Sequence, residues 1–133
     1  MQLKETMHFI ELPYVTISYQ EPIVYFRFMD GAELGFPEIR ELISQAEKLS
    51  DFKPYLTFSD VRNDVNVTNE GKRMLENFNN MPLFRGSAVL VKNNLYRFAV
   101  DFMNYYNKPK FPFKAFTSEE KAINWLLSLP LNS

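Results

Sequence analysis

The residues best suited to chemistry lie in one stretch, DVRNDVNVTNEGKRML, at residues 60 to 75. Asp60 and Asp64 are two nearby carboxylates, and such a pair could hold Mg²⁺ or share general acid and base work if the fold brings them together. Arg62 lies between them, and we interpret it first as an ion-pair partner of Asp60 or Asp64 and second as a ligand-binding group. The stretch therefore supplies Asp60 and Arg62 as candidate binding residues.

Thr68, in the same stretch, precedes a predicted helix and has two interpretations. Threonine is a preferred N-cap, worth about 1 kcal/mol over alanine, and the Asn and Asp residues before it tolerate turns, so a capped corner accounts for the pattern. Alternatively, the free N–H groups of the first turn, together with Lys72 or Arg73, could bind an anion or a phosphorylated Thr68. Thr68 is therefore a third candidate binding residue.

The composition leaves little else that could do chemistry. The chain has no cysteine and one histidine, His8, which excludes thiol catalysis and makes a zinc site a poor explanation. Its four glycines form neither a GxGxxG nor a GxxxxGK phosphate loop. We therefore predict a protein that is not an enzyme, with no catalytic residue, no cofactor and no metal site. The net charge of −1 likewise predicts no nucleic acid partner and no anionic membrane partner.

A predicted helix at residues 94–106 carries more apolar surface than a sheet can cover. Its core stripe is expected to contain Leu95, Phe98, Ala99, Phe102 and Tyr106. Four further apolar residues widen the apolar arc to roughly 220°, and these are Tyr96, Val100, Met103 and Tyr105. The surplus must face a neighbouring segment of the chain, a second subunit or partner, or an apolar ligand. We take Tyr96, Val100 and Met103 as candidate contact residues.

The elements that position these residues alternate along the chain. Strands are predicted at 8–20, 22–29, 55–61, 86–91 and 111–116, from runs of β-branched and aromatic residues. Helices are predicted at 37–49, 68–79, 94–106 and 117–129, the last opened by a capping box from Thr117 to Glu120. The order β-β-α-β-α-β-α-β-α predicts an α/β fold whose five-stranded sheet is mostly parallel, with an opening hairpin and four helices.

Four segments carry a further pattern: FSDVR at 58–62, Thr68 with GKRML at 71–75, AVLV at 88–91, and KPKFPFKAFTSEEKAINWL at 108–126. With the element order, they resemble the STAS domain, the fold of the bacterial anti-sigma-factor antagonists of the SpoIIAA type, and more closely a group of uncharacterised bacterial STAS-like or SEC14-like proteins. In the antagonists, the joint between strand and helix carries Asp-Ser-Ser-Gly with a phosphorylated serine. Here the matching segment reads NVTNEG, with Thr68 as the hydroxyl in reach of that position.

The resemblance implies a protein without known catalytic activity that acts in protein contact or small-ligand sensing. We therefore predict a single STAS-like domain over residues 1–133, a regulatory or signalling module that works through protein–protein contacts or as a homodimer. The alternative is a carrier or sensor of a small apolar, lipid-like ligand. The N-terminus shows no export signal and the chain no long apolar run, so we expect a cytoplasmic protein.

Overall fold

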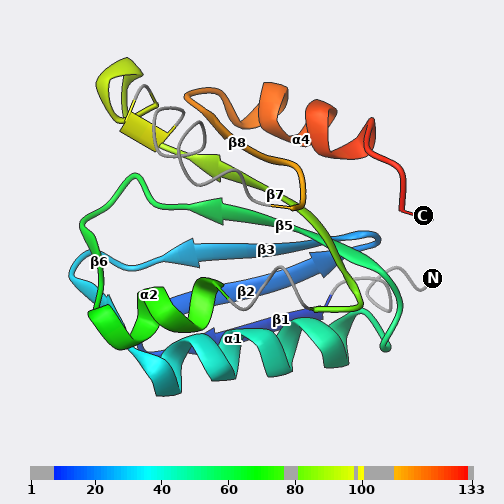
Figure 1. The fold of residues 1–133 in the computed structure, drawn as a ribbon, viewed down its shortest axis with the longest axis horizontal. Helices are drawn as coiled ribbons and strands as arrows, with labels where there is room; N and C mark the ends of the chain where they lie inside the picture. The colour runs from blue at the N-terminus through cyan, green and yellow to red at the C-terminus, as the bar shows by residue number, and fades with distance from the viewer. Residues whose placement is uncertain (1–7, 77–80, 98, 101–109, 132–133) are drawn as a thin grey trace.

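The computed structural model describes residues 8–76, 81–97, 99–100 and 110–131. A six-stranded sheet in the order β1-β2-β3-β5-β7-β8 forms its centre (Figure 1). The first three strands pair antiparallel, and β3, β5, β7 and β8 run parallel to one another. The strands are β1 (His8–Leu12), β2 (Val15–Gln20), β3 (Ile23–Phe28), β5 (Tyr55–Asp60), β7 (Phe84–Leu90) and β8 (Phe113–Phe116).

Three helices and a small second sheet complete the described fold. The helices are α1 (Phe36–Leu49), α2 (Asn69–Glu76) and α4 (Glu119–Leu127), and residues 94–97 and 99–100 are also helical. The second sheet pairs β4 (Ala32–Leu34) with β6 (Val65–Val67) in parallel. Within the ranges described, no helix has the length and apolar character needed to cross a membrane. The predicted α/β class is confirmed.

The predicted strand count was wrong, because residues 8–20 form two strands instead of one. Leu12 pairs with Val15, so Pro13 and Tyr14 make a two-residue turn between β1 and β2. Proline has a fixed φ and no N–H to donate, which suits a turn and disrupts a central strand. The main sheet therefore has six strands, and the opening hairpin becomes a three-stranded antiparallel meander.

The sheet is covered on both faces, and each face has its own core. On one face α1 packs on β2 and β3, with the buried residues Ile17, Val24, Phe26, Ile39, Leu42 and Ala46. On the other face α4 packs on β5 and β7, with the buried residues Leu56, Phe58, Ala88, Leu90, Ala122 and Leu126. Successive strand residues point to opposite faces, so β3 and β5 each contribute to both cores. The strand β7 also contributes to both, because a register shift between Phe84 and Ser87 turns Phe84 toward the α1 side.

The starts of α1 and α4 follow from local sequence, although the first residue of α1 and the N-cap of α4 each differ by one residue from the prediction. The helix α1 begins at Phe36, before Pro37, and the Glu38 carboxylate accepts the Gly35 N–H at 2.9 Å. The predicted cap of the last helix at Thr117 was wrong. Ser118 is the N-cap, and its hydroxyl accepts the N–H of Lys121 at 3.3 Å. Both residues are good caps, so residue preference alone did not separate them.

Candidate functional site

The ends of three parallel strands meet at one edge of the main sheet, which we call the carboxyl edge. Val61, just after β5, donates its N–H to the Leu90 carbonyl of β7 at 3.0 Å. Val91 in turn donates to the Phe116 carbonyl of β8 at 2.8 Å. Residues that follow these strands therefore leave the sheet side by side. In open α/β sheets this edge is the usual place for a binding site.

A chain of four charged side chains crosses the carboxyl edge. Arg62 donates from Nε and Nη2 to the two carboxylate oxygens of Asp60, at 3.0 and 2.8 Å. Arg27, on β3, lies 3.4 Å from the same carboxylate and makes a bidentate pair with Glu119 of α4, at 3.1 and 2.9 Å. The predicted pairing of Arg62 with Asp60 is confirmed. Sequence analysis did not single out Arg27 or Glu119, which are distant in sequence from Asp60 and carry no local signal.

The network holds Asp60 in its ionised form. Burial alone would raise the pKa of Asp60, but the hydrogen bonds from Arg62 and the charges of Arg62 and Arg27 outweigh it, so the pKa lies below its ordinary value. The hydrogen bond to Glu119 raises the pKa of Arg27 further above its usual range. The Arg27 guanidinium also lies 5.4 Å from the centre of the Phe58 ring, which extends the network onto the core.

Asp64, the second aspartate of the predicted pair, lies at a different corner of the fold, where its backbone makes two hydrogen bonds. Asp64 donates its N–H to the Asp30 carboxylate at 3.0 Å, and its carbonyl accepts the Gly31 N–H at 2.8 Å. Both interactions tie β6 to the turn before β4. Across the residues that the structure describes, no three carboxylate or imidazole groups come close enough together to hold a metal ion.

Thr68 caps α2, as predicted. Its hydroxyl accepts the Gly71 N–H at 3.0 Å, and its own N–H donates to the Leu34 carbonyl at 3.0 Å. Gly71 lies so close to β4 that a Cβ there would stand 2.3 Å from the Leu34 carbonyl oxygen. The first turn of α2 is therefore pressed directly against the end of β4.

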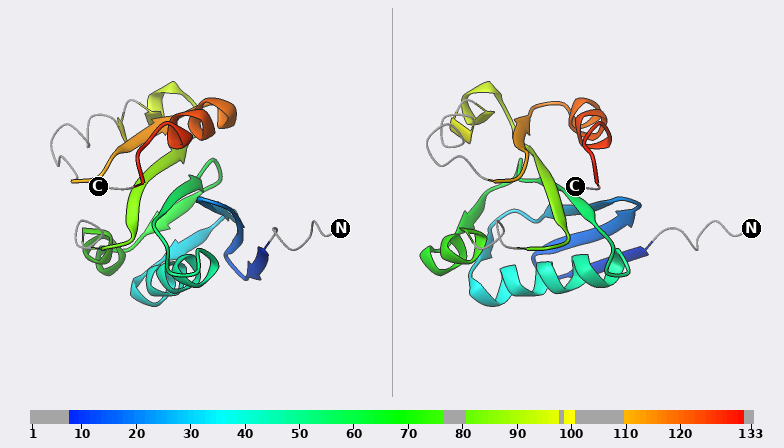
Figure 2. Two further views of the ribbon diagram at one scale, coloured as in Figure 1. Left: turned by 90° about the vertical axis from the view of Figure 1, so that its right-hand side faces the viewer. Right: turned by 45° about the vertical axis from the view of Figure 1, so that its right-hand side comes forward.

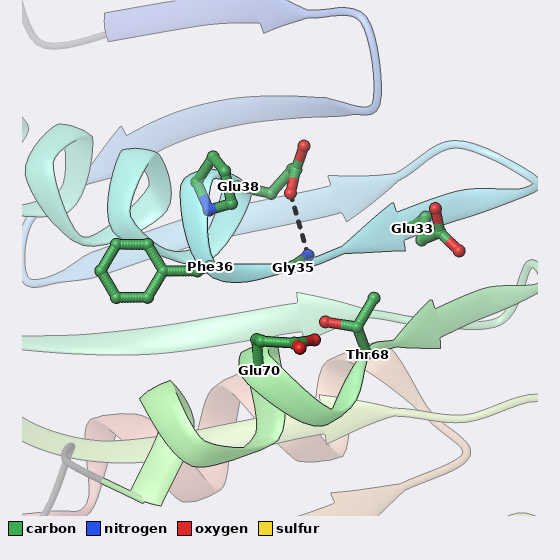
Figure 3. Close-up of a pocket in the computed structure, with 7 residues that line it drawn as sticks. Glu33, Gly35, Phe36, Glu38, Thr68 and Glu70 are labelled. Atoms are coloured by element: carbon green, nitrogen blue, oxygen red, sulfur yellow. Dashed lines mark hydrogen bonds between the residues drawn. The ribbon is translucent and has the colours of Figure 1, made fainter.

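A shallow depression of about 320 Å³ lies beside Thr68 (Figure 3). Figure 3 shows Glu70 close to Thr68, with Glu38 and Glu33 facing them across the depression. Its lining residues are Glu33, Gly35, Phe36, Pro37, Glu38, Thr68 and Glu70. Three of these side chains are carboxylates and none is cationic, so the surroundings favour a cation over an anion.

The helical residues that follow β7 expose apolar side chains. Leu95 is 75% exposed and Tyr96 is 48% exposed, while Val100 is half-buried. The prediction that Leu95 and Ala99 belong to the core was wrong, since both are exposed. Asn93 caps this segment by accepting the Tyr96 N–H at 3.1 Å, which places Leu95 in the first helical turn after β7. The other residues of the predicted stripe and Met103 lie outside the described residues.

The comparisons with known proteins agree with this geometry. A solved structure of an uncharacterized DUF3478-family protein from Shewanella loihica PV-4, which has a SpoIIAA-like fold, matches with a TM-score of 0.58 at 13% identity, covering 90% of this chain and 91% of that chain. The fold is therefore SpoIIAA-like, as predicted. The family model described as domain of unknown function DUF7793 matches residues 17–129, and the chain belongs to that family. No curated protein matches the chain.

Proposed function

We propose that this protein is a non-enzymatic SpoIIAA-like module that binds a protein partner at the carboxyl edge of its sheet. The observation that carries the proposal is the exposure of two successive apolar residues, Leu95 and Tyr96, in the first helical turn after β7. We call these two residues, with Arg62 and Lys92, the docking surface. Aromatic residues and arginine are enriched at protein interfaces, and Lys92 adds a positive charge beside Tyr96.

Contacts with neighbouring side chains restrain three of the four docking-surface residues, Lys92, Tyr96 and Arg62, before any partner binds. The Lys92 ammonium lies 5.0 Å from the centre of the Tyr96 ring. Arg62 is held by Asp60, yet its side chain remains 53% exposed. Side chains that are already ordered lose less conformational entropy on binding, which supports affinity. The basic rim favours a partner segment that combines acidic and apolar residues.

We assign Thr68 to helix capping and leave it out of the docking surface. Its hydroxyl is engaged by the Gly71 N–H, and the depression beside it is lined by Glu33, Glu38 and Glu70. A phosphate group on Thr68 would face these carboxylates at close range, which is electrostatically unfavourable. Asp60 contributes indirectly, because it orients Arg62.

Site-specific crosslinking tests the docking surface. A photo-crosslinking amino acid replaces Leu95, and in a matched control it replaces Leu127, which is 58% exposed on α4. We expect one protein to be captured from position 95 and not from position 127, and to be lost from an otherwise identical protein that carries Tyr96→Ala and Lys92→Glu. Equal capture from both positions, or capture that survives the added substitutions, would contradict the proposal.

Native mass spectrometry of freshly purified protein separates this proposal from the alternative of an apolar-ligand carrier. Two shallow depressions lined by described residues, of about 320 and 360 Å³, border charged side chains such as Glu33, Glu70 and Arg40. Apolar ligands prefer walls that are predominantly hydrophobic. We expect the mass of the bare chain, and a copurified lipid-sized mass would favour the carrier.

A further inference from the structure

Within the part of the chain that the structure describes, the strand β1 has one hydrogen-bonding edge with no strand paired to it. It pairs with β2 alone and forms the rim of the described part of the molecule (Figure 2). Because Leu12 and Val15 close a two-residue turn, they form a hydrogen-bonded pair, and the alternation of an antiparallel ladder makes Ile10 and Ile17 the next one. The N–H and C=O groups of Phe9 and Glu11 therefore point away from β2.

The side chains of β1 do little to protect this edge. Phe9 is 61% exposed, Glu11 is exposed, and Ile10 is half-buried against the core beneath α1. Natural sheets commonly protect their edges with lysine or proline. At the opposite edge, β8 carries an exposed lysine, Lys114, whereas β1 contains no lysine. Each strand adjoins one proline, Pro112 before β8 and Pro13 after β1. The two edges of the sheet thus differ in their protection against strand addition.

We infer that β1 pairs antiparallel with β1 of a second copy of this chain, which joins two sheets into one. A register with two-fold symmetry about Ile10 places Phe9 opposite the partner's Glu11 and Glu11 opposite the partner's Phe9. Each of these pairs exchanges two N–H···O bonds, so the register satisfies the outward groups of both residues with about four hydrogen bonds. The positions of the outward N–H and C=O groups of Phe9 and Glu11 therefore favour pairing of β1 with β1 of a second copy.

The side chains in this register are complementary. On the α1 side, Ile10 meets the partner's Ile10 and extends the apolar layer that it already joins. On the other side, the Phe9 ring covers the methylene groups of the partner's Glu11. A register centred on Glu11 would instead place two carboxylates directly opposite each other, which is unfavourable. The symmetric register about Ile10 is therefore preferred.

A five-residue strand makes a small interface. Stable dimers bury about 1,000 Å² or more, and one short edge buries less, so the dimer is weak and depends on concentration. Analytical ultracentrifugation from about 10 µM to about 1 mM covers the range in which such a dimer forms. We expect a reversible monomer–dimer equilibrium over this range. A chain that stays monomeric throughout would overturn the inference.

Two substitutions of Glu11 locate the interface. Glu11→Pro removes an outward N–H that the β1–β2 ladder does not use, and an edge strand tolerates proline at such a position. We expect it to weaken dimerisation by about tenfold or more, because hydrogen bonds across the interface are lost. Glu11→Val is the matched control, since it keeps the N–H and removes the charge, and it should dimerise at least as tightly as the wild type. A dimer unaffected by Glu11→Pro would contradict the β1 interface.

Amide hydrogen exchange tests the same interface without any substitution. The amides of Phe9 and Glu11 should exchange more slowly at about 1 mM than at about 10 µM, while those of Ile10 and Leu12, which bond to β2, should not change. The variant that carries Tyr96→Ala and Lys92→Glu serves to separate the two proposals. It should abolish capture of the protein partner from position 95 and leave the β1 dimer intact, and loss of the dimer in this variant would place the second copy on the docking surface and overturn the inference.

Discussion

The two ends of the segment from Asp60 to Gly71 are held in place by different physical means. At the first end, Asp60 is fixed by charge, through Arg62 and Arg27. At the second end, Gly71 is fixed by the absence of a side chain, because the Leu34 carbonyl occupies the space that a Cβ would need. One end is a network of adjustable side chains, and the other is a contact between two backbones.

This difference determines what each end can tolerate. Side chains in an ion-pair network can rearrange around a change, and water can reach Arg62, which is 53% exposed. A backbone contact cannot rearrange without moving a whole helix, since α2 and β4 are both regular elements. We therefore expect a substitution at Gly71 to lower the free energy of unfolding more than a substitution at Asp60 does.

The largest expected effect is that of Gly71→Ala. The new Cβ would lie 2.3 Å from the Leu34 carbonyl oxygen and 3.0 Å from a methyl group of Val67. Overpacking of this kind costs about 3 kcal/mol of unfolding free energy, measured by urea denaturation. Gly31→Ala is the control, because Gly31 has a φ of +83° but nothing within 4 Å, so backbone strain alone should cost about 1 kcal/mol. If the two variants lost the same unfolding free energy, the close contact between Gly71 and Leu34 would not be what makes this end sensitive.

An intermediate effect is expected for Asp60→Asn, which keeps the shape of the side chain and removes its charge. The loss of charged hydrogen bonds to a side chain that is only 12% exposed should cost about 1.5 kcal/mol at pH 7. Arg62→Gln should cost less than about 0.5 kcal/mol, because the arginine is solvated. A larger loss from Arg62→Gln than from Asp60→Asn would show that Asp60 is not the centre of the network.

The pH dependence of stability sharpens the same test. The pKa of Asp60 is lowered in the folded protein, so between the folded and unfolded pKa values the unfolded chain binds more protons, and stability rises with pH. The contribution of Asp60 is therefore fully present above about pH 3.9, the unfolded value, and is lost as the pH falls below it. The stability difference between the wild type and Asp60→Asn should shrink on acidification in that window. A constant difference would mean that the charge of Asp60 does not matter.

Leaving the control variants aside, the smallest effect is expected for Thr68→Ala, which removes the hydroxyl that accepts the Gly71 N–H. The loss of an N-cap costs about 1 kcal/mol, measurable by urea denaturation. Thr68→Ser retains the hydroxyl and should stay close to the wild type. If serine proved as destabilising as alanine, the methyl group and not the cap would be what matters at this position.

Local chemistry predicted one part of this segment and not the other. The pairing of Asp60 with Arg62 and the cap at Thr68 both connect residues close in sequence, where residue type alone indicates the partner. The contacts of Gly71 with Leu34 and of Arg27 with Glu119 connect residues far apart, and no local pattern marks them. The parallel pair β4–β6, with three residues in each strand, is likewise too short to show a periodic pattern.

Two further predictions differed from the structure even though the sequence carried a relevant signal, because that signal was ambiguous. Pro13 stands between apolar residues on both sides, so the run from residue 8 to 20 resembles one strand although proline itself indicates a break. Leu95 fits an apolar stripe by spacing, yet spacing fixes only the relative phase of residues and not which side meets the sheet. In the structure Leu95 lies in the first turn after the Asn93 cap and is exposed.

The sharing of β3, β5 and β7 between the two cores has a consequence for cooperativity. Ile23 and Val24 are neighbours on one strand, yet one supports the layer under α4 and the other the layer under α1. A change that shifts such a strand moves side chains in both layers at once, so the two layers are energetically coupled. Occupancy of the sheet by a partner on one side could thereby alter the packing on the opposite side without any hinge or moving domain.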